Sequence, residues 1–213
     1  MIVNSLGVVI ANRDLGEFDR LITVYTQDRG KIPVRLVWVR RPQAKLLTFS
    51  QVAVWAEFRL YLKPRSHYSK GIGGAILSVF PRIRQSWAKT LKAMYLCELM
   101  DKLTPEHQPN SYKYDLLVSA LEVLERTPGF YLPVAFGLRL LGHAGFHDSG
   151  TAPKFLSASS LWECLHDSDL QDLEKGTWDP EQLSLCREWL EDRVREVASR
   201  ELQTPRFFSL ISP

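Results

Sequence analysis

Residues 51–63 read QVAVWAEFRLYLK, and their pattern is the clearest indication of the fold of the N-terminal part of the chain. Apolar side chains occupy every even-numbered position from Val52 to Leu62, and the positions between them carry mostly polar or amphipathic residues such as Trp55 and Arg59. An unbroken period of two is typical of a β-strand with one buried face. We therefore predict a strand over residues 50–63 whose even-numbered side chains point into a core.

The period of two extends to neighbouring segments. Residues 31–38 alternate in the same way, with an apolar face from Ile32 to Trp38, and the Asp-Arg-Gly at 28–30 predicts the tight turn of a hairpin. Together with residues 50–63, the candidate strands cover residues 2–12, 20–26, 31–40 and 67–79. Five short strands with no helix-length insertion predict an OB-fold, a small closed β-barrel, over residues 1–80.

Beyond Pro81 the apolar period lengthens to about 3.6 residues, which predicts helices. The first stripe consists of Trp87, Leu91, Met94, Tyr95, Leu99 and Leu103, and further stripes lie within residues 116–124, 136–141 and 183–197. The helix that contains residues 136–141 should end between Gly142 and Gly145. Residues 147–180 are rich in Ser, Asp, Gly and Pro, which predicts a partly irregular excursion. The predicted fold class is α+β, with an N-terminal OB-fold five-stranded β-barrel followed by an all-helical C-terminal domain over residues 81–213.

The composition indicates a globular protein. The chain has 213 residues, of which 45% are hydrophobic, with no apolar run long enough to span a membrane and no basic segment preceding an apolar N-terminal stretch. We therefore expect a soluble, cytoplasmic protein. The cysteines, Cys97, Cys164 and Cys186, lie far apart without any CxxC or CxxH pair, so we expect reduced core residues, no metal site and no cofactor.

The charge is strongly divided along the chain. Residues 1–92 contain 16 Lys and Arg against 5 Asp and Glu, a net charge of +11, whereas residues 93–213 contain 11 against 19, a net charge of −8. The overall charge is only +3 because these two values oppose each other. The asymmetry indicates that the N-terminal part meets a polyanion. The alternative is that the two domains attract each other electrostatically.

Catalytic motifs are absent or fail in context. The GIGG at residues 71–74 lacks the Lys-Ser/Thr of a phosphate-binding loop and leads into a strand-like run, so a glycine-rich barrel strand explains it better. His143 and His147 have the spacing of metal ligands on one helix, but Gly142 and Gly145 indicate that the helix ends between them. No nucleophile elbow, zinc-protease or paired-carboxylate signature occurs, and we do not expect an enzyme.

Basic and aromatic residues are interleaved on the N-terminal strands. The odd-numbered face of residues 51–63 combines stacking surface with phosphate-neutralising charge, as single-stranded nucleic acid requires, and residues 39–45, VRRPQAK, add three cations in a loop. The candidate DNA-binding residues are Arg35, Arg40, Arg41, Lys45, Trp55, Arg59, Tyr61, Lys63 and Arg65. The alternative is a solvated basic face whose aromatic residues, Trp55 above all, pack against the helical domain.

Several motifs, in their order along the chain, resemble those of the RecO family of bacterial recombination mediators. The similar segments are GEFDRL at residues 16–21, YTQDRGKI at 25–32, RRP at 40–42, LCELMDKL at 96–103 and FGLRLLGHAGF at 136–146. The resemblance is continuous over about residues 1–146 and looser beyond, returning near residues 200–208. It therefore covers the predicted barrel and the first helices behind it.

The resemblance implies a non-enzymatic protein with an OB-fold ahead of a helical domain, which binds single- and double-stranded DNA without ATP and anneals complementary strands. It also implies two partners, RecR and the acidic C-terminal tail of single-strand DNA-binding protein (SSB). With them the family helps to load the RecA recombinase on SSB-coated DNA during recombinational repair, at the bacterial nucleoid. In this chain we expect the SSB tail in an apolar groove between helices near a cation, for which Arg139 and Arg206 are the candidates.

The sequence departs from the family pattern at three places. The loop after Pro42 is shorter than usual, which leaves fewer residues to contact DNA. Many members carry a four-cysteine zinc site after the helix that ends here at Phe146, and those cysteines are missing, so we expect no zinc. Pro-Val-Ala at residues 133–135 replaces basic residues of some members, which bears on how the SSB tail is bound.

Two other functions remain open from the sequence. An RNA-binding or translation-associated OB-fold protein would have the same basic, aromatic barrel, because contacts to the 2′-hydroxyl distinguish the two polymers. A scaffold that binds only proteins would place its basic half against an acidic partner. Competition between matched DNA and RNA oligonucleotides separates the first alternative, and the affinity for DNA at low salt separates the second.

Overall fold

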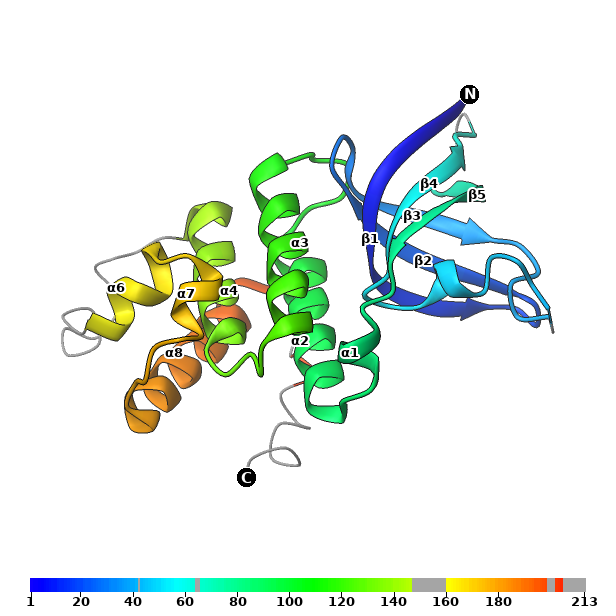
Figure 1. The fold of residues 1–213 in the computed structure, drawn as a ribbon. Helices are drawn as coiled ribbons and strands as arrows, with labels where there is room; N and C mark the ends of the chain where they lie inside the picture. The colour runs from blue at the N-terminus through cyan, green and yellow to red at the C-terminus, as the bar shows by residue number, and fades with distance from the viewer. Residues whose placement is uncertain (42, 64–65, 147–159, 199–201, 205–213) are drawn as a thin grey trace. The chain divides into compact units, whose positions relative to one another are not determined.

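The computed structural model of the chain describes residues 1–41, 43–63, 66–146, 160–198 and 202–204 (Figure 1). The chain divides into two compact units. We call residues 1–81 and 104–118 the barrel unit, and residues 82–103 and 119–213 the helical unit. Each unit is therefore built from two separate stretches of sequence.

Within the described residues of the barrel unit, five strands close into a barrel in the order β1-β2-β3-β5-β4 (Figure 1). The strands are β1 (Ile2–Leu15), β2 (Asp19–Thr26), β3 (Gly30–Leu36), β4 (Trp55–Tyr61) and β5 (Ser69–Ser78). β1 pairs with both β2 and β4, which closes the barrel, and β3 runs parallel to β5. The predicted OB-fold barrel is confirmed, as is the hairpin turn at residues 28–30.

The even-numbered face of residues 51–63 points into the barrel from Val54 to Leu60, as the alternation predicts. The strand begins at Trp55, however, and not at residue 50. Residues 48–50 form a short 3₁₀ helix, η1 (Thr48–Ser50), and Ala53 has a left-handed φ of 58°. The backbone turns there because the Ala53 N–H donates a 2.8 Å hydrogen bond to the carbonyl oxygen of Val9. The barrel core consists of Val9, Ile22, Val24, Ile32, Val34, Leu36, Val39, Phe49, Val54, Ala56, Phe58 and Leu60.

The strand predicted over residues 31–40 ends early, at Leu36. Trp38, expected on the buried face, is 58% exposed and has a left-handed φ of 58°. Its N–H donates a 2.8 Å hydrogen bond to the carboxylate of Asp19 at the start of β2. This side-chain acceptor reverses the backbone, so Val39 enters the core in place of Trp38.

Residues 104–118 pack on the outside of the barrel within the same unit. The backbone N–H of His107 donates a 3.0 Å hydrogen bond to the carbonyl oxygen of Lys31. Gly30 has a φ of 65°, and a Cβ on it would lie 2.2 Å from the carbonyl oxygen of Gln108. Only glycine fits this approach of two backbones. Tyr25, on the face of β2 opposite to the core, is fully buried, and burial raises the pKa of its hydroxyl to about 12.

The helical unit is built around α4. Its described helices are α1 (Pro81–Arg84, from residue 82 on), α2 (Trp87–Leu103), the second half of α3 (Ser111–Arg126), α4 (Leu132–Leu141), α6 (Ser160–Asp167), α7 (Leu170–Leu173) and α8 (Pro180–Ala198). α4 contacts α2, α6, α7 and α8, and all of its residues except Arg139 are buried. A π-helical turn, η2 (Gly142–Phe146), follows, with Gly145 at φ 86°. The helix end that these glycines predict is confirmed.

The predicted apolar stripes are buried on α3 and largely on α8, but α2 differs. Trp87 and Met94, expected in the stripe of α2, are 61% and 44% exposed. The buried face of α2 instead includes Leu96, Cys97 and Met100. The reason is that α2 contacts both α4 and α8, so it needs a wider apolar face than one stripe provides. Within the predicted excursion at residues 147–180, α6 and α7 follow residues 147–159, which lie outside the described part.

Glutamates satisfy backbone N–H groups at the starts of segments in the helical unit. The Glu174 carboxylate accepts hydrogen bonds of 2.8 to 2.9 Å from the N–H groups of residues 130–132, at the start of α4. The Glu125 carboxylate accepts two of 2.9 Å from those of residues 82–83. Negative charge at a helix N-terminus is favourable because it meets the positive end of the helix dipole. Part of the excess of Asp and Glu in residues 93–213 therefore serves to stabilise the helical unit.

Candidate nucleic-acid interface

The strand register gathers basic and aromatic side chains on the outer face of the barrel. Arg59 and Tyr61 of β4 are both exposed. Tyr61 is paired with Lys70 of β5, and Lys70 is paired in turn with Arg35 of β3. Because directly paired residues share a face of a sheet, Arg35, Lys70 and Tyr61 form a row across three strands, with Arg59 beside it. We call Arg35, Arg59, Tyr61 and Lys70 the basic sheet face; Lys63 is exposed just after the end of β4.

Arg35 is held on this face by a buried acid. Asp19 is 7% exposed, and its carboxylate accepts hydrogen bonds from Arg35 Nε at 2.8 Å and Nη2 at 2.5 Å. The N–H of Trp38 and, to a lesser degree, the Arg35 guanidinium hold the pKa of Asp19 below its usual value. The Arg35 side chain remains 40% exposed, so it can be reached from solvent while part of its charge is balanced by Asp19.

A second group of cations lies where the chain leaves β3. Arg40 and Arg41 are both exposed, but Arg40 is tied to the turn between β1 and β2. Its Nη1 donates to the carbonyl oxygens of Gly16 and Glu17 at 3.3 and 3.2 Å, and its Nη2 lies 3.4 Å from the carboxylate of Asp14. Arg40 therefore holds two turns together as well as presenting charge.

Arg41 lies instead against aromatic rings. The central carbon of its guanidinium is 4.1 Å from the centroid of the Trp38 ring and 4.8 Å from that of Phe18. Such an arrangement is attractive because the ring faces carry partial negative charge. We call Phe18, Trp38 and Arg41 the turn cluster. Lys45 is exposed further along the same loop.

Trp55 differs from its neighbours on β4. It is partly buried, and its Nε1 donates a 2.9 Å hydrogen bond to the hydroxyl of Tyr114, in the part of α3 that belongs to the barrel unit. Burial raises the pKa of Tyr114, and the hydrogen bond from Trp55 partly opposes that rise. An anchored indole of this kind offers less open ring surface than Tyr61 does.

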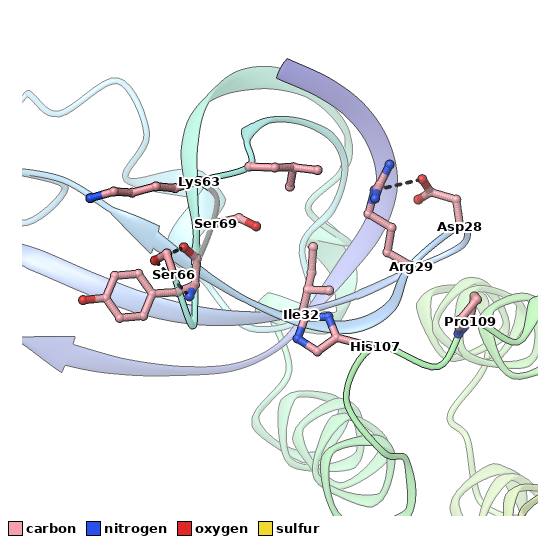
Figure 2. A pocket seen from close by; sticks show the side chains of 10 residues that line it. Asp28, Arg29, Ile32, Lys63, Ser66, Ser69, His107 and Pro109 are labelled. Atoms are coloured by element: carbon pink, nitrogen blue, oxygen red, sulfur yellow. Dashed lines mark hydrogen bonds and ion pairs between the residues drawn. The ribbon is translucent and has the colours of Figure 1, made fainter. Parts of the chain in front are cut away.

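A pocket of about 400 Å³ adjoins Lys63 at one end of the barrel (Figure 2). Its walls come from the turn between β2 and β3, the connection between β4 and β5, and the residues ahead of α3. Arg29 Nε lies 3.2 Å from the carboxylate of Asp28, and Lys63 points away from Arg29 and His107 (Figure 2). The cations that line the pocket therefore do not converge on one point.

Lys70, Phe18 and Trp38 belong to this surface although the sequence does not single them out. Lys70 falls in a predicted strand, but the glycines at 71, 73 and 74 leave no readable face there. Trp38 continues the apolar alternation of residues 31–38, so it is predicted as core. The period of two would have allowed a surface position for Trp38 only if the early end of β3 had been known. Arg65, a predicted site residue, lies outside the described residues.

Arg139, a predicted contact of the SSB tail, is partly buried on α4. Its Nε donates a 2.9 Å hydrogen bond to the carbonyl oxygen of Leu165, and its Nη2 donates to that of Ser168. These carbonyls lie at the C-terminal end of α6, where a cation is favourable. The guanidinium thus joins α4 to the end of α6. Arg206, the other candidate, lies outside the described residues.

Within the described part of the chain, no group of three or more His, Cys, Asp or Glu side chains could hold a metal ion. His147 is outside that part. Cys97 and Cys186 are buried, Cys164 is partly exposed, and none of these three cysteines forms a disulfide. No described helix is both long enough and apolar enough to cross a membrane.

Two family models match the chain. The one described as "Recombination protein O N terminal" matches residues 1–78, and the one described as "Recombination protein O C terminal" matches residues 84–148. Together they cover about two thirds of the chain. The first match coincides with the barrel and the second begins with the helices that follow it.

Curated proteins named "DNA repair protein RecO" are similar to this chain. The protein of Exiguobacterium sibiricum is 33% identical over 150 residues, 68% of this chain and 58% of that protein. That of Bacillus pumilus is 30% identical over 128 residues, 58% of this chain and 48% of that protein, and that of Bacillus subtilis is 26% identical over 152 residues, 69% and 57%. The chain spans about half the length of the curated relatives it matches.

Proposed function

Because this chain belongs to the RecO family of DNA repair proteins, we propose that it is a recombination mediator that binds DNA through its barrel and anneals complementary single strands. The observation that carries the proposal is the row of Arg35, Lys70 and Tyr61 across three strands, with Arg59 beside it. Cations next to an exposed aromatic ring are what single-stranded nucleic acid binds. The curated relatives are named for DNA repair, which favours DNA as the polymer.

The mechanism needs no covalent step. The basic sheet face and the loop with Arg40, Arg41 and Lys45 neutralise phosphates on two strands at once. This lowers the repulsion between the strands while their bases search for register. Contacts of this kind position a backbone without reading its sequence. In the proposed mechanism the protein therefore acts on many DNA sequences and is not an enzyme.

Two partners belong to the proposal on the strength of the family. RecR and the acidic tail of SSB would connect DNA binding to the loading of RecA on SSB-coated strands of the bacterial chromosome. We place the SSB tail on the helical unit near a cation, with Arg139 and Arg206 as candidates. Since Arg139 donates to carbonyls at the end of α6, its proposed role includes shaping the groove as well as attracting the peptide.

Strand annealing tests the proposal directly. Two complementary labelled 50-mers would be mixed with the full chain, first bare and then coated with SSB. We expect faster annealing than without protein in both cases. Acceleration of bare strands alone would retain DNA annealing and remove the partnership with SSB. Absence of acceleration together with binding weaker than millimolar at low salt would leave a protein-binding scaffold.

The polymer and the SSB tail need separate measurements. Competition between DNA and RNA oligonucleotides of one sequence should favour DNA, and a clear preference for RNA would replace this proposal with an RNA-binding OB-fold.

Titration of the full chain with a labelled SSB-tail peptide should saturate at low salt. Arg139→Ala should weaken that binding, whereas the exposed Lys175→Ala should not.

A further inference from the structure

Trp38 is exposed in a conformation that its side chain disfavours. The residue is 58% exposed, and its φ of 58° lies in the left-handed region, where a bulky residue is a true outlier. A backbone of this kind persists only where surrounding contacts hold it, and such positions gather at binding sites. An exposed indole in this setting therefore indicates a binding site.

Dedicated contacts hold Trp38 in place. Its N–H is bound by the carboxylate of Asp19, which is itself buried and paired with Arg35. Its carbonyl oxygen accepts a 3.3 Å hydrogen bond from the N–H of Arg41, which closes the turn. The N–H of Arg40 donates 3.0 Å to the carbonyl oxygen of Phe18, which fixes this turn against the turn between β1 and β2. The position of the indole is thus built into the barrel.

The surroundings of the indole combine ring surface with charge. The Arg41 guanidinium lies 4.1 Å from the Trp38 ring centroid, and the ring is still mostly open to solvent. Phe18, which contacts the same guanidinium, is 37% exposed. The acids nearby are Asp14, Glu17 and Asp19. Asp14 pairs with Arg20 and Arg40, and Asp19 pairs with Arg35, which leaves Glu17 exposed at the turn.

We propose that Trp38 is a stacking site for one unpaired base of single-stranded DNA, with Arg41 contacting the phosphate beside that base. This rests on the proposed binding of DNA and adds a basis for preferring single strands. An unpaired base can leave its neighbours and lie on an indole, whereas a base inside a duplex is already stacked and paired. The basic sheet face serves both forms, because both carry phosphates.

The test compares variants on matched single-stranded and duplex oligonucleotides across a salt series. Trp38→Ala should weaken binding to the single strand by about 5- to 150-fold, the range for loss of one base–aromatic stack, and change duplex binding by less than about twofold. The slope of log affinity against log salt should stay at the wild-type value, because no charge is removed. Trp38→Phe should retain most of the affinity.

Further variants separate stacking from folding. Trp38→Gly removes the ring while suiting the left-handed backbone, so it should be at least as stable as wild type and yet lose the same affinity for the single strand. Trp87→Ala, which removes another highly exposed indole but from α2, should bind like wild type. The decrease in tryptophan fluorescence when single-stranded DNA binds should be smaller in Trp38→Phe than in wild type.

The outcomes distinguish this proposal from the one on which it rests. If wild type binds both DNA forms and Trp38→Gly binds each of them as tightly as wild type does, the proposed stacking site is wrong and the proposed DNA binding stands. An equal loss for single strand and duplex would make Trp38 a general contact and also overturn the proposal. If wild type binds neither form, the proposed function itself has failed.

Discussion

Trp55 donates a 2.9 Å hydrogen bond from its indole Nε1 to the hydroxyl of Tyr114. The bond joins β4 to the start of α3 within the barrel unit and links residues that are 59 positions apart in the chain. Trp55 shares its face of β4 with the exposed Arg59 and Tyr61, yet it is partly buried. The two ends of this strand therefore have different roles.

Removal of this hydrogen bond should lower stability without affecting DNA binding. Trp55→Phe and Tyr114→Phe should each reduce the free energy of unfolding, and the double variant should lose less than the sum, with a coupling of about 0.5 to 1.5 kcal/mol. Urea unfolding of the four proteins measures the cycle. Weaker DNA binding by Trp55→Phe, but not by Tyr114→Phe, would instead place Trp55 in the interface.

Arg59 and Lys70 should contribute charge to DNA binding and little to stability. We expect Arg59→Ala combined with Lys70→Ala to reduce the salt slope for single-stranded DNA by about 1.4, because each lost phosphate contact is worth about 0.7. The melting temperature should hardly move, since both side chains are exposed. Lys175→Ala, in the helical unit, is the control for loss of an exposed cation. An unchanged slope in the double variant would move the DNA surface elsewhere.

Arg40 and Arg41, which follow the end of β3, should differ in how much they contribute to stability. Arg41→Ala should reduce the salt slope by about 0.7 and leave stability within about 0.5 kcal/mol. Arg40→Ala should in addition lower the free energy of unfolding by about 0.5 to 1 kcal/mol, because it loses contacts to Gly16, Glu17 and Asp14. Thermal unfolding and fluorescence anisotropy at several salt concentrations give both quantities. Identical behaviour of the two variants would contradict this division.

Asp19 makes the stability of the barrel depend on pH in the acid range. Its folded-state pKa lies below the ordinary value of 3.8, so its contribution is fully present above about pH 4 and is lost as the pH falls through the folded pKa. Asp19→Asn should be about 1 to 3 kcal/mol less stable than wild type at pH 7. That gap should narrow by pH 3. Urea unfolding at both pH values measures it, and a gap that is independent of pH would show that ionisation of Asp19 is not involved.

Glu174 should stabilise the helical unit through the start of α4. Glu174→Gln replaces a carboxylate that accepts from three backbone N–H groups, and we expect a loss of about 1 kcal/mol. Glu188→Gln, on an exposed position of α8, is the matched control and should change stability by less than about 0.5 kcal/mol. Chemical unfolding followed by helical circular dichroism compares the two. Equal effects would mean that general charge, and not the cap, is responsible.

The local period was enough to predict the barrel, because β4 buries Val54, Ala56, Phe58 and Leu60 on one face and alternation reports that directly. It failed at Trp38, where the backbone N–H donates a hydrogen bond to a carboxylate 19 residues away and the strand has already ended. Lys70 shows a related limit. Its place beside Arg35 and Tyr61 depends on strand pairing, which no local pattern encodes. Composition indicated which half of the chain is basic, whereas register decides which cations lie together.

The return of residues 104–118 to the barrel unit affects how the protein can be dissected. A fragment that stops at residue 81 would lack the backbone partner of Lys31 and the hydroxyl that receives the Trp55 hydrogen bond. Its behaviour would be that of an unfinished barrel, and poor solubility or weak DNA binding would say nothing about the intact surface. A fragment of residues 82–213 would in turn carry residues 104–118 without the strands of the unit to which they belong. Because the chain crosses between its units three times, no single proteolytic cut yields both of them complete.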